Sequence, residues 1–218
     1  MNSATPRVLF FHGLESGVNG KKSRYLAEQF PNSFTPNLKP YYALPCSLWK
    51  AIVAIHRFKP NVIVGSSFGG FIAMFLLQTR VWKGDTILLA PATGLLFKKR
   101  LWLPADDRNN IVIVAGANDT TVPLDGLSKL QNLSLNNVQF LIVEDDHQLN
   151  TSMIEQNQLK DLINANYQSS ITNNTINNYF DCTRLWLRCL LSLIVSFIRE
   201  PLTLYRTTKR LREMYKPD

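Results

Sequence analysis

The first 164 residues alternate short, strongly apolar runs with segments of helical periodicity, which is typical of a parallel β-sheet with crossover helices. The runs are rich in β-branched and aromatic residues, as expected for strands buried on both faces. The predicted strands are Val8–Phe11, Val62–Val64, Thr86–Leu89, Ile111–Val114 and Val138–Val143, with a weaker one near Ser33–Pro36. The predicted helices are Lys21–Phe30, Leu48–Phe58, Gly69–Arg80, Leu124–Leu130 and Asn150–Asn164. The sequence therefore predicts an α/β fold, with a mostly parallel sheet covered by helices on both faces.

The chain has 218 residues, enough for one full-sized domain and an appendage. After residue 164 the composition changes to Asn, Ser and Thr with few core-forming residues, which is typical of a linker or exposed loop. The next segment is apolar and basic, and its arginines and serines fall on one narrow stripe of a predicted helix. We therefore predict an α/β domain at 1–164, a polar linker or loop at 165–178 and a helical extension at 179–218.

The formal net charge is +8, and residues 179–218 supply half of it, with eight Lys and Arg against four Asp and Glu. A basic excess favours contact with anionic surfaces, but no zinc-finger, RNA-recognition or basic-aromatic pattern is present, so we expect no nucleic-acid partner. The three scattered cysteines form no CxxC pair, which argues against disulfides and structural zinc, and we expect Cys46 to be buried. The N-terminus lacks the features of a secretory signal, so we expect a cytoplasmic protein.

The sequence GSSFG at residues 65–69 lies between a predicted strand and a predicted helix. A serine on a sharp strand-to-helix turn needs very small residues two positions before and after it, because the backbone is crowded there. Gly65 and Gly69 meet that need around Ser67. The start of the helix favours developing negative charge, because its free N–H groups and its dipole point toward the serine. We therefore predict that Ser67 is a nucleophile.

A serine hydroxyl is a weak nucleophile until a base takes its proton. Asp119 and His147 each follow one of the last two predicted strands, so they should emerge at the same sheet edge as Ser67. The order Ser, Asp, His is the one expected for a hydrolase triad on an α/β sheet. We predict that His147 is the general base and then the general acid, and that Asp119 orients it. Asp145 and Asp146 compete with Asp119 for this role, although their place beside the histidine aims them poorly at its ring.

The loop after the first predicted strand reads HGLESG from His12 onward. An oxyanion hole needs two backbone N–H groups aimed at the developing charge. We assign these donors to Leu14 in this loop and to Phe68, the residue after the nucleophile. His12 would help to shape the loop rather than act as the base.

Five motifs together resemble small single-domain esterases of the YqiA type, within the α/β-hydrolase superfamily: HGLESG, GSSFGGFIA, LLAPA, GANDTTVP and DDHQL. The resemblance covers about residues 7–155 and implies hydrolysis of acyl esters or thioesters without a metal or organic cofactor. It also implies that Ser67, Asp119 and His147 form the triad, with Leu14 and Phe68 as oxyanion donors. The segment after residue 164 has no counterpart in this resemblance.

Residues 91–110 lie where many larger relatives carry a cap domain, and about twenty residues are too few for a domain. We predict instead a minimal flap in which Phe97 and Trp102 bind substrate at the border of the acyl pocket. The alternative is that these side chains only cover the sheet.

The charge-free run in the extension, residues 189–198, has ten residues, whereas a membrane-crossing helix needs about 20. We therefore expect no membrane span. Three interpretations stay open: the helix packs onto the α/β domain, it contacts a membrane surface peripherally through residues 183–199, or it forms a subunit contact.

Together these patterns predict a serine hydrolase that cleaves small carboxylic esters or thioesters through an acyl-enzyme. The alternative is a catalytically silent binding protein with a hydrolase fold, in which the C-terminal helix recruits a membrane or a protein partner. The acyl length and the oligomeric state are left open.

Overall fold

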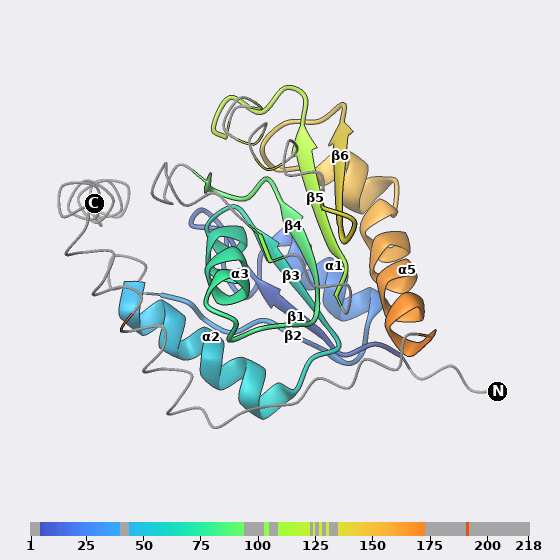
Figure 1. Ribbon diagram of the computed structural model, residues 1–218. Coiled ribbons are helices and arrows are strands. Elements are labelled where there is room, and N and C mark those ends of the chain that lie inside the picture. The colour runs from blue at the N-terminus through green and yellow to red at the C-terminus, as the bar shows by residue number, and fades with distance from the viewer. Residues whose placement is uncertain are drawn as a thin grey trace.

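The computed structural model describes residues 5–39, 44–93, 103–104, 109–122, 124, 127, 130, 135–172 and 191. In these residues six strands form one sheet in the order β2-β1-β3-β4-β5-β6, and every neighbouring pair is parallel (Figure 1). The strands are β1 Val8–Phe11, β2 Ser33–Phe34, β3 Val62–Ser66, β4 Asp85–Leu89, β5 Ile111–Gly116 and β6 Val138–Val143. The helices are α1 Lys21–Gln29, α2 Leu44–Phe58, α3 Phe68–Gln78 and α5 Gln158–Thr172, with a short π-helix at Thr151–Glu155. The predicted α/β fold with a parallel sheet is confirmed.

Two hydrophobic layers cover the two faces of the sheet, because successive strand residues point to opposite sides. In β1, Leu9 and Phe11 pack with α2 and α3, whereas Val8 and Phe10 pack with α1 and α5. Figure 1 shows α2 and α3 on one side of the sheet and α1 and α5 on the other. The central strands β1, β3, β4 and β5 are buried along their whole length, which explains their continuous apolar runs.

Several predicted boundaries differ from the structure by a few residues. Helix α2 begins at Leu44 rather than at Leu48, and β5 continues two residues further, to Gly116. The prediction that Cys46 is buried is wrong, because the residue is exposed near the start of α2.

The C-terminal part of the described chain departs furthest from the prediction. The expected helix at 150–164 is instead a π-helix at Thr151–Glu155 followed, after Asn157 at a φ of 57°, by α5. Helix α5 continues to Thr172, so residues 165–172 are helical where a linker was predicted. The reason is packing: Asn166 is buried and Tyr167 packs against the core formed with α1. Tertiary contacts thus outweigh the low helix propensity of this segment.

Some predictions fall on residues that the structure does not describe. Phe97 and Trp102 of the proposed flap lie outside the described residues, as do 173–178 and all of the 179–218 extension except residue 191. Of the predicted helix at 124–130, residues 124, 127 and 130 are described, and each is helical. Within the described ranges, no helix has the length and apolarity required to cross a membrane.

A matched pair of isoleucines tests the packing of the sheet. Ile63 lies in β3 between β1 and β4 and is fully buried, whereas Ile142 lies in the edge strand β6 and is 51% exposed. We expect Ile63→Ala to lower the free energy of unfolding by about 2–5 kcal/mol, because it leaves a cavity in a closed core. Ile142→Ala should cost about 1 kcal/mol or less. Urea denaturation measures both, and equal losses would contradict the burial described here.

Candidate active site

The three side chains of the predicted triad meet at the carboxyl edge of the sheet. Ser67 follows β3, Asp119 lies in the loop after β5 and His147 lies in the loop after β6. The carboxyl ends of parallel strands share one edge, which is where ligands bind in open α/β sheets. The register places these strand ends side by side, since β3 pairs with β4, β4 with β5 and β5 with β6.

Ser67 occupies the strained turn between β3 and α3. Its backbone lies at φ 51° and ψ −113°. Residues with a side chain rarely adopt this region, and it costs of order 1–3 kcal/mol. Two backbone hydrogen bonds hold the turn from the neighbouring segment. The Ser67 N–H donates to the Leu89 carbonyl over 2.9 Å, and the Ala92 N–H donates to the Ser67 carbonyl over 3.0 Å. Ser67 therefore has the strained backbone expected of a serine that projects from a strand-to-helix turn.

The glycines around Ser67 permit this turn because no side chain fits there. A Cβ at Gly65 would lie 2.6 Å from the carbonyl oxygen of Gly69, across the turn. A Cβ at Gly69 would overlap the carbonyl group of Phe11, at the end of β1. A Cβ at Gly70 would lie 2.9 Å from the Cα atom of Pro91, so the third glycine lets α3 approach the loop after β4. The predicted need for small residues at 65 and 69 is thus explained by backbone packing.

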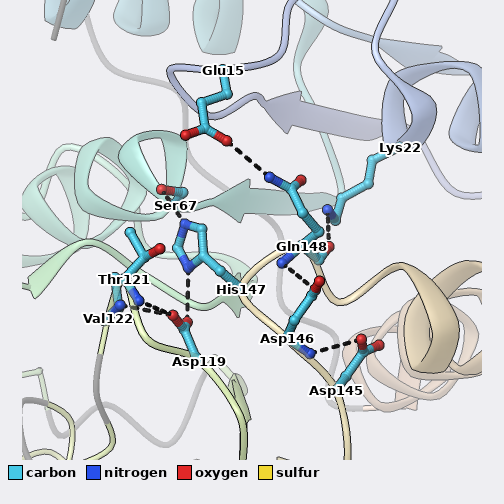
Figure 2. Close-up of polar contacts among 10 residues, drawn as sticks. All are labelled: Glu15, Lys22, Ser67, Asp119, Thr121, Val122, Asp145, Asp146, His147 and Gln148. Atoms are coloured by element: carbon cyan, nitrogen blue, oxygen red, sulfur yellow. Dashed lines mark hydrogen bonds and ion pairs between the residues drawn. The ribbon is translucent and has the colours of Figure 1, made fainter.

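Ser67, His147 and Asp119 form a continuous chain of hydrogen bonds (Figure 2). His147 Nε2 lies 3.0 Å from Ser67 Oγ, and His147 Nδ1 lies 2.8 Å from Asp119 Oδ2. Because a carboxylate only accepts hydrogen bonds, the proton of the neutral ring belongs on Nδ1. Nε2 then presents a lone pair to the Ser67 hydroxyl, which is the tautomer a general base requires.

Asp119 is held rigidly behind the histidine. Its side chain is only 1% exposed, against 14% for that of His147. The other carboxylate oxygen, Oδ1, accepts the backbone N–H groups of Thr121 and Val122, each over 2.8 Å. One oxygen thus anchors the loop while the other faces the imidazole, so Asp119 can orient the ring in one position.

The two competing carboxylates, those of Asp145 and Asp146, accept hydrogen bonds from backbone N–H groups and not from the His147 ring. Asp145 Oδ1 accepts the Asp146 N–H and its Oδ2 accepts the Ser152 N–H, each over 2.8 Å, and Asp146 Oδ1 accepts the Gln148 N–H over 2.7 Å. Burial alone would raise the pKa of Asp145, but hydrogen bonds, chiefly from the Ser152 and Asp146 backbones, lower it below its ordinary value. Asp145 and Asp146 therefore brace the turn around His147, and the carboxylate that contacts the ring belongs to Asp119.

His12 is the first residue of the loop after β1; it is fully buried and has both ring nitrogens engaged. Nδ1 lies 2.9 Å from the Gly13 carbonyl, and the Leu38 N–H donates to Nε2 over 3.4 Å. Burial lowers the pKa of His12 below its ordinary value, which favours the neutral ring that these two bonds require. His12 thus shapes the loop, as predicted. The same loop approaches the nucleophile, since a Cβ at Gly13 would lie 3.3 Å from Ser67 Cβ.

The residues predicted to supply oxyanion donors flank Ser67. Phe68 is the first residue of α3 and is fully buried, and Leu14 is partly buried against the core formed with α2 and α3. Leu14, Ser67 and His147 line a cavity of about 90 Å³, together with Thr121. Its remaining wall comes from Phe10 of β1, Ser66 of β3, the loop after β1, the start of α1 and the residues after His147.

Sequence reasoning missed the contribution of α1 to this site. Lys22 lines the cavity, and its ammonium group donates to the Gln148 carbonyl, 126 positions further along the chain (Figure 2). Lys22 lies in no motif, so its contact with the histidine loop follows only from the packing of α1. Among the described residues, no group of three or more His, Cys, Asp or Glu is placed to hold a metal ion.

A pair of glycines tests the origin of the strained turn. Gly69→Ala would place a methyl group onto the Phe11 carbonyl, whereas nothing lies within 4 Å of a Cβ at Gly17. We expect Gly69→Ala to lower stability by about 3 kcal/mol or more, because backbone atoms cannot move aside as a side chain can. Gly17→Ala should leave the melting temperature nearly unchanged. Thermal denaturation decides, and two equally stable variants would contradict the described packing of α3 on β1.

No protein-family model matches the sequence, and a search of curated proteins finds no match either. Solved structures do match. A Xanthomonas campestris protein assigned to the α/β-hydrolase superfamily has a TM-score of 0.58 at 22% identity, over 73% of this chain and 99% of that one. Mouse alpha/beta hydrolase domain-containing protein 10 has a TM-score of 0.57 at 16% identity, over 76% of this chain and 92% of that one. The Pyrococcus furiosus esterase Pf2001 has a TM-score of 0.56 at 14% identity, over 77% of this chain and 82% of that one.

At these identities the similarity is one of architecture. The chain therefore has the fold of the α/β-hydrolase superfamily.

Proposed function

We propose that this protein is a serine hydrolase that cleaves carboxylic ester or thioester bonds through an acyl-enzyme. The observation that carries the proposal is the hydrogen-bonded chain from Ser67 through His147 to Asp119, at 3.0 and 2.8 Å. The strained backbone of Ser67 adds support, because strain of this kind persists where a catalytic group must be held in place. The fold shared with solved hydrolases and esterases agrees with this chemistry.

In the first half-reaction Ser67 Oγ attacks the carbonyl carbon of the substrate, and His147 Nε2 takes the hydroxyl proton. The carbonyl π electrons move onto oxygen, giving a tetrahedral intermediate. Asp119 stabilises the imidazolium that forms, because its Oδ2 accepts the Nδ1–H. When the intermediate collapses, the bond to the alcohol or thiol breaks and His147 returns its proton to that leaving group. Ser67 then carries the acyl group.

In the second half-reaction water replaces the departed alcohol or thiol. His147 takes a proton from the water, the hydroxide attacks the acyl carbon, and the proton passes to Ser67 Oγ as the acid leaves. The slight exposure of the His147 side chain leaves a route for this water, while Asp119 behind it stays shielded. No cofactor is needed at either step.

The backbone N–H groups of Leu14 and Phe68 are our proposed oxyanion donors. Phe68 begins α3, an eleven-residue helix whose N-terminal dipole favours negative charge beside Ser67. Leu14 lines the cavity next to Ser67, on the loop that His12 supports. Donors held by a loop anchored through the buried His12 and by a helix start need little reorganisation when the charge develops.

Two adjacent serines give a matched test of the nucleophile. Ser66 and Ser67 both line the cavity, but only Ser67 Oγ contacts His147. We expect Ser67→Ala to reduce kcat for short acyl esters and thioesters by about 10³-fold or more, because the members of a triad act as a unit. Ser66→Ala should keep kcat within about tenfold of wild type, since the triad stays intact. The measurement is steady-state hydrolysis by the full chain, with circular dichroism to check that each variant folds.

The opposite result has a definite meaning. If the folded wild-type chain hydrolyses none of a panel of short and long acyl esters and thioesters, or if Ser67→Ala keeps full activity, the proposal is wrong. The competing account, a catalytically silent binding protein with a hydrolase fold, would then be preferred.

A further inference from the structure

Lys22 joins helix α1 to the loop that carries His147. The residue is only 8% exposed, and its ammonium group donates a hydrogen bond to the carbonyl oxygen of Gln148, the residue after His147. In Figure 2 the lysine side chain runs from α1 toward Gln148, on the far side of His147 from Asp119. The neighbouring Lys21 differs: its side chain is 50% exposed and pairs with Glu155 over 3.0 Å.

The loop around His147 concentrates negative charge opposite Lys22. Asp145 and Asp146 both attract the ammonium group electrostatically, and both also bind backbone N–H groups within the same turn. Gln148 is also linked to the loop after β1, since its Nε2 donates to Glu15 Oε2 over 3.0 Å. The carbonyl that Lys22 holds therefore lies in a turn where Asp145, Asp146 and the Gln148 side chain also form hydrogen bonds.

Burial disfavours the charged form of the Lys22 side chain. Burial lowers the pKa of Lys22 to about 8, because desolvation outweighs the attraction of Asp145 and Asp146, and Lys21 lowers it further. The unfolded chain binds the proton more tightly than the folded chain does, so the protonated form is disfavoured by folding. A buried ion held against such a cost is weak evidence for a role in stability. A role in organising the site explains its place better.

We propose that Lys22 is a positioning residue that holds the His147 loop in the geometry where the imidazole reaches both Ser67 and Asp119. This inference rests on the proposed function, in which His147 is the base. Lys22 acts through the Gln148 carbonyl and through its attraction to Asp145 and Asp146. A ring displaced by about 1 Å lowers the rate of a proton-transfer step by up to about 10²-fold.

The charge of the Lys22 ammonium group predicts a pH dependence of kcat. The titratable groups that face or adjoin the ammonium group are Asp145, Asp146, Glu15 and His147 from the opposing loops and Lys21 from its own helix. Above a pH of about 8 Lys22 loses its proton, and its attraction to the two aspartates disappears. Wild-type kcat should therefore fall on the alkaline side with an apparent pKa near 8, and removal of the lysine should abolish that limb.

Two neighbouring lysines provide the test in the full chain. Lys22→Met keeps the length of the side chain but removes the cation, and Lys21→Met makes the same change at an exposed position. We expect Lys22→Met to lower kcat for a small neutral ester by about 10- to 100-fold with KM changed less than about twofold. Lys21→Met should lower kcat far less than Lys22→Met does, because the exposed Lys21 ammonium group pairs with Glu155 and not with the His147 loop. Lys22→Arg, which keeps the charge and donors, should retain part of kcat.

Hydrogen–deuterium exchange of residues 144–150 gives a readout independent of turnover. We expect faster exchange in Lys22→Met than in Lys21→Met. Equal exchange in the two variants, or faster exchange with kcat and its alkaline limb unchanged, would overturn the proposal. If the wild type shows no turnover, the proposed function fails by itself, while the exchange rates still decide whether Lys22 holds the loop.

Discussion

The close approach of α3 to β1 is the constraint on which the site depends. At Gly69 the backbone lies so near the Phe11 carbonyl that no side chain fits between them. This contact lets α3 begin directly after Ser67, which accepts a φ of 51° as a consequence. Because β1 is the neighbour of β3, the same contact brings the loop after β1 against the nucleophile, with Gly13 beside Ser67. One packing requirement thus places both the serine and the loop proposed to supply an oxyanion donor.

The other half of the site is His147, which lies on a loop and not within a helix or strand of its own. Residues on both sides of His147 form side-chain to backbone hydrogen bonds with one another. These contacts fix the position of the imidazole ring. Asp119 sets the ring from one side through Nδ1, while Asp145 and Asp146 close the turn that carries it. Lys22 reaches the same turn from α1. A catalytic group on a loop needs such supporting contacts, because a loop alone leaves it too loosely placed.

Much of this arrangement could be predicted from the sequence, because its signals are local. The strands β1 and β6 have the predicted bounds, and the GSSFG motif carries its own steric explanation. The choice of Asp119 over Asp145 also followed from chain geometry. The remaining features depend on distant contacts. Lys22 meets Gln148 across 126 positions, and residues 165–172 become helical through the packing of Asn166 and Tyr167, so their polar composition misled the prediction.

The most direct test of the central claim is to map where a fluorophosphonate probe bonds to the folded, full-length protein. The probe forms a covalent bond only with a serine whose proton a neighbouring base removes. Peptide mass spectrometry should find the phosphonyl group on Ser67, and the label should be absent from a Ser67→Ala variant. A folded wild-type chain that carries no adduct, or that carries it on Ser66 instead, would contradict the account.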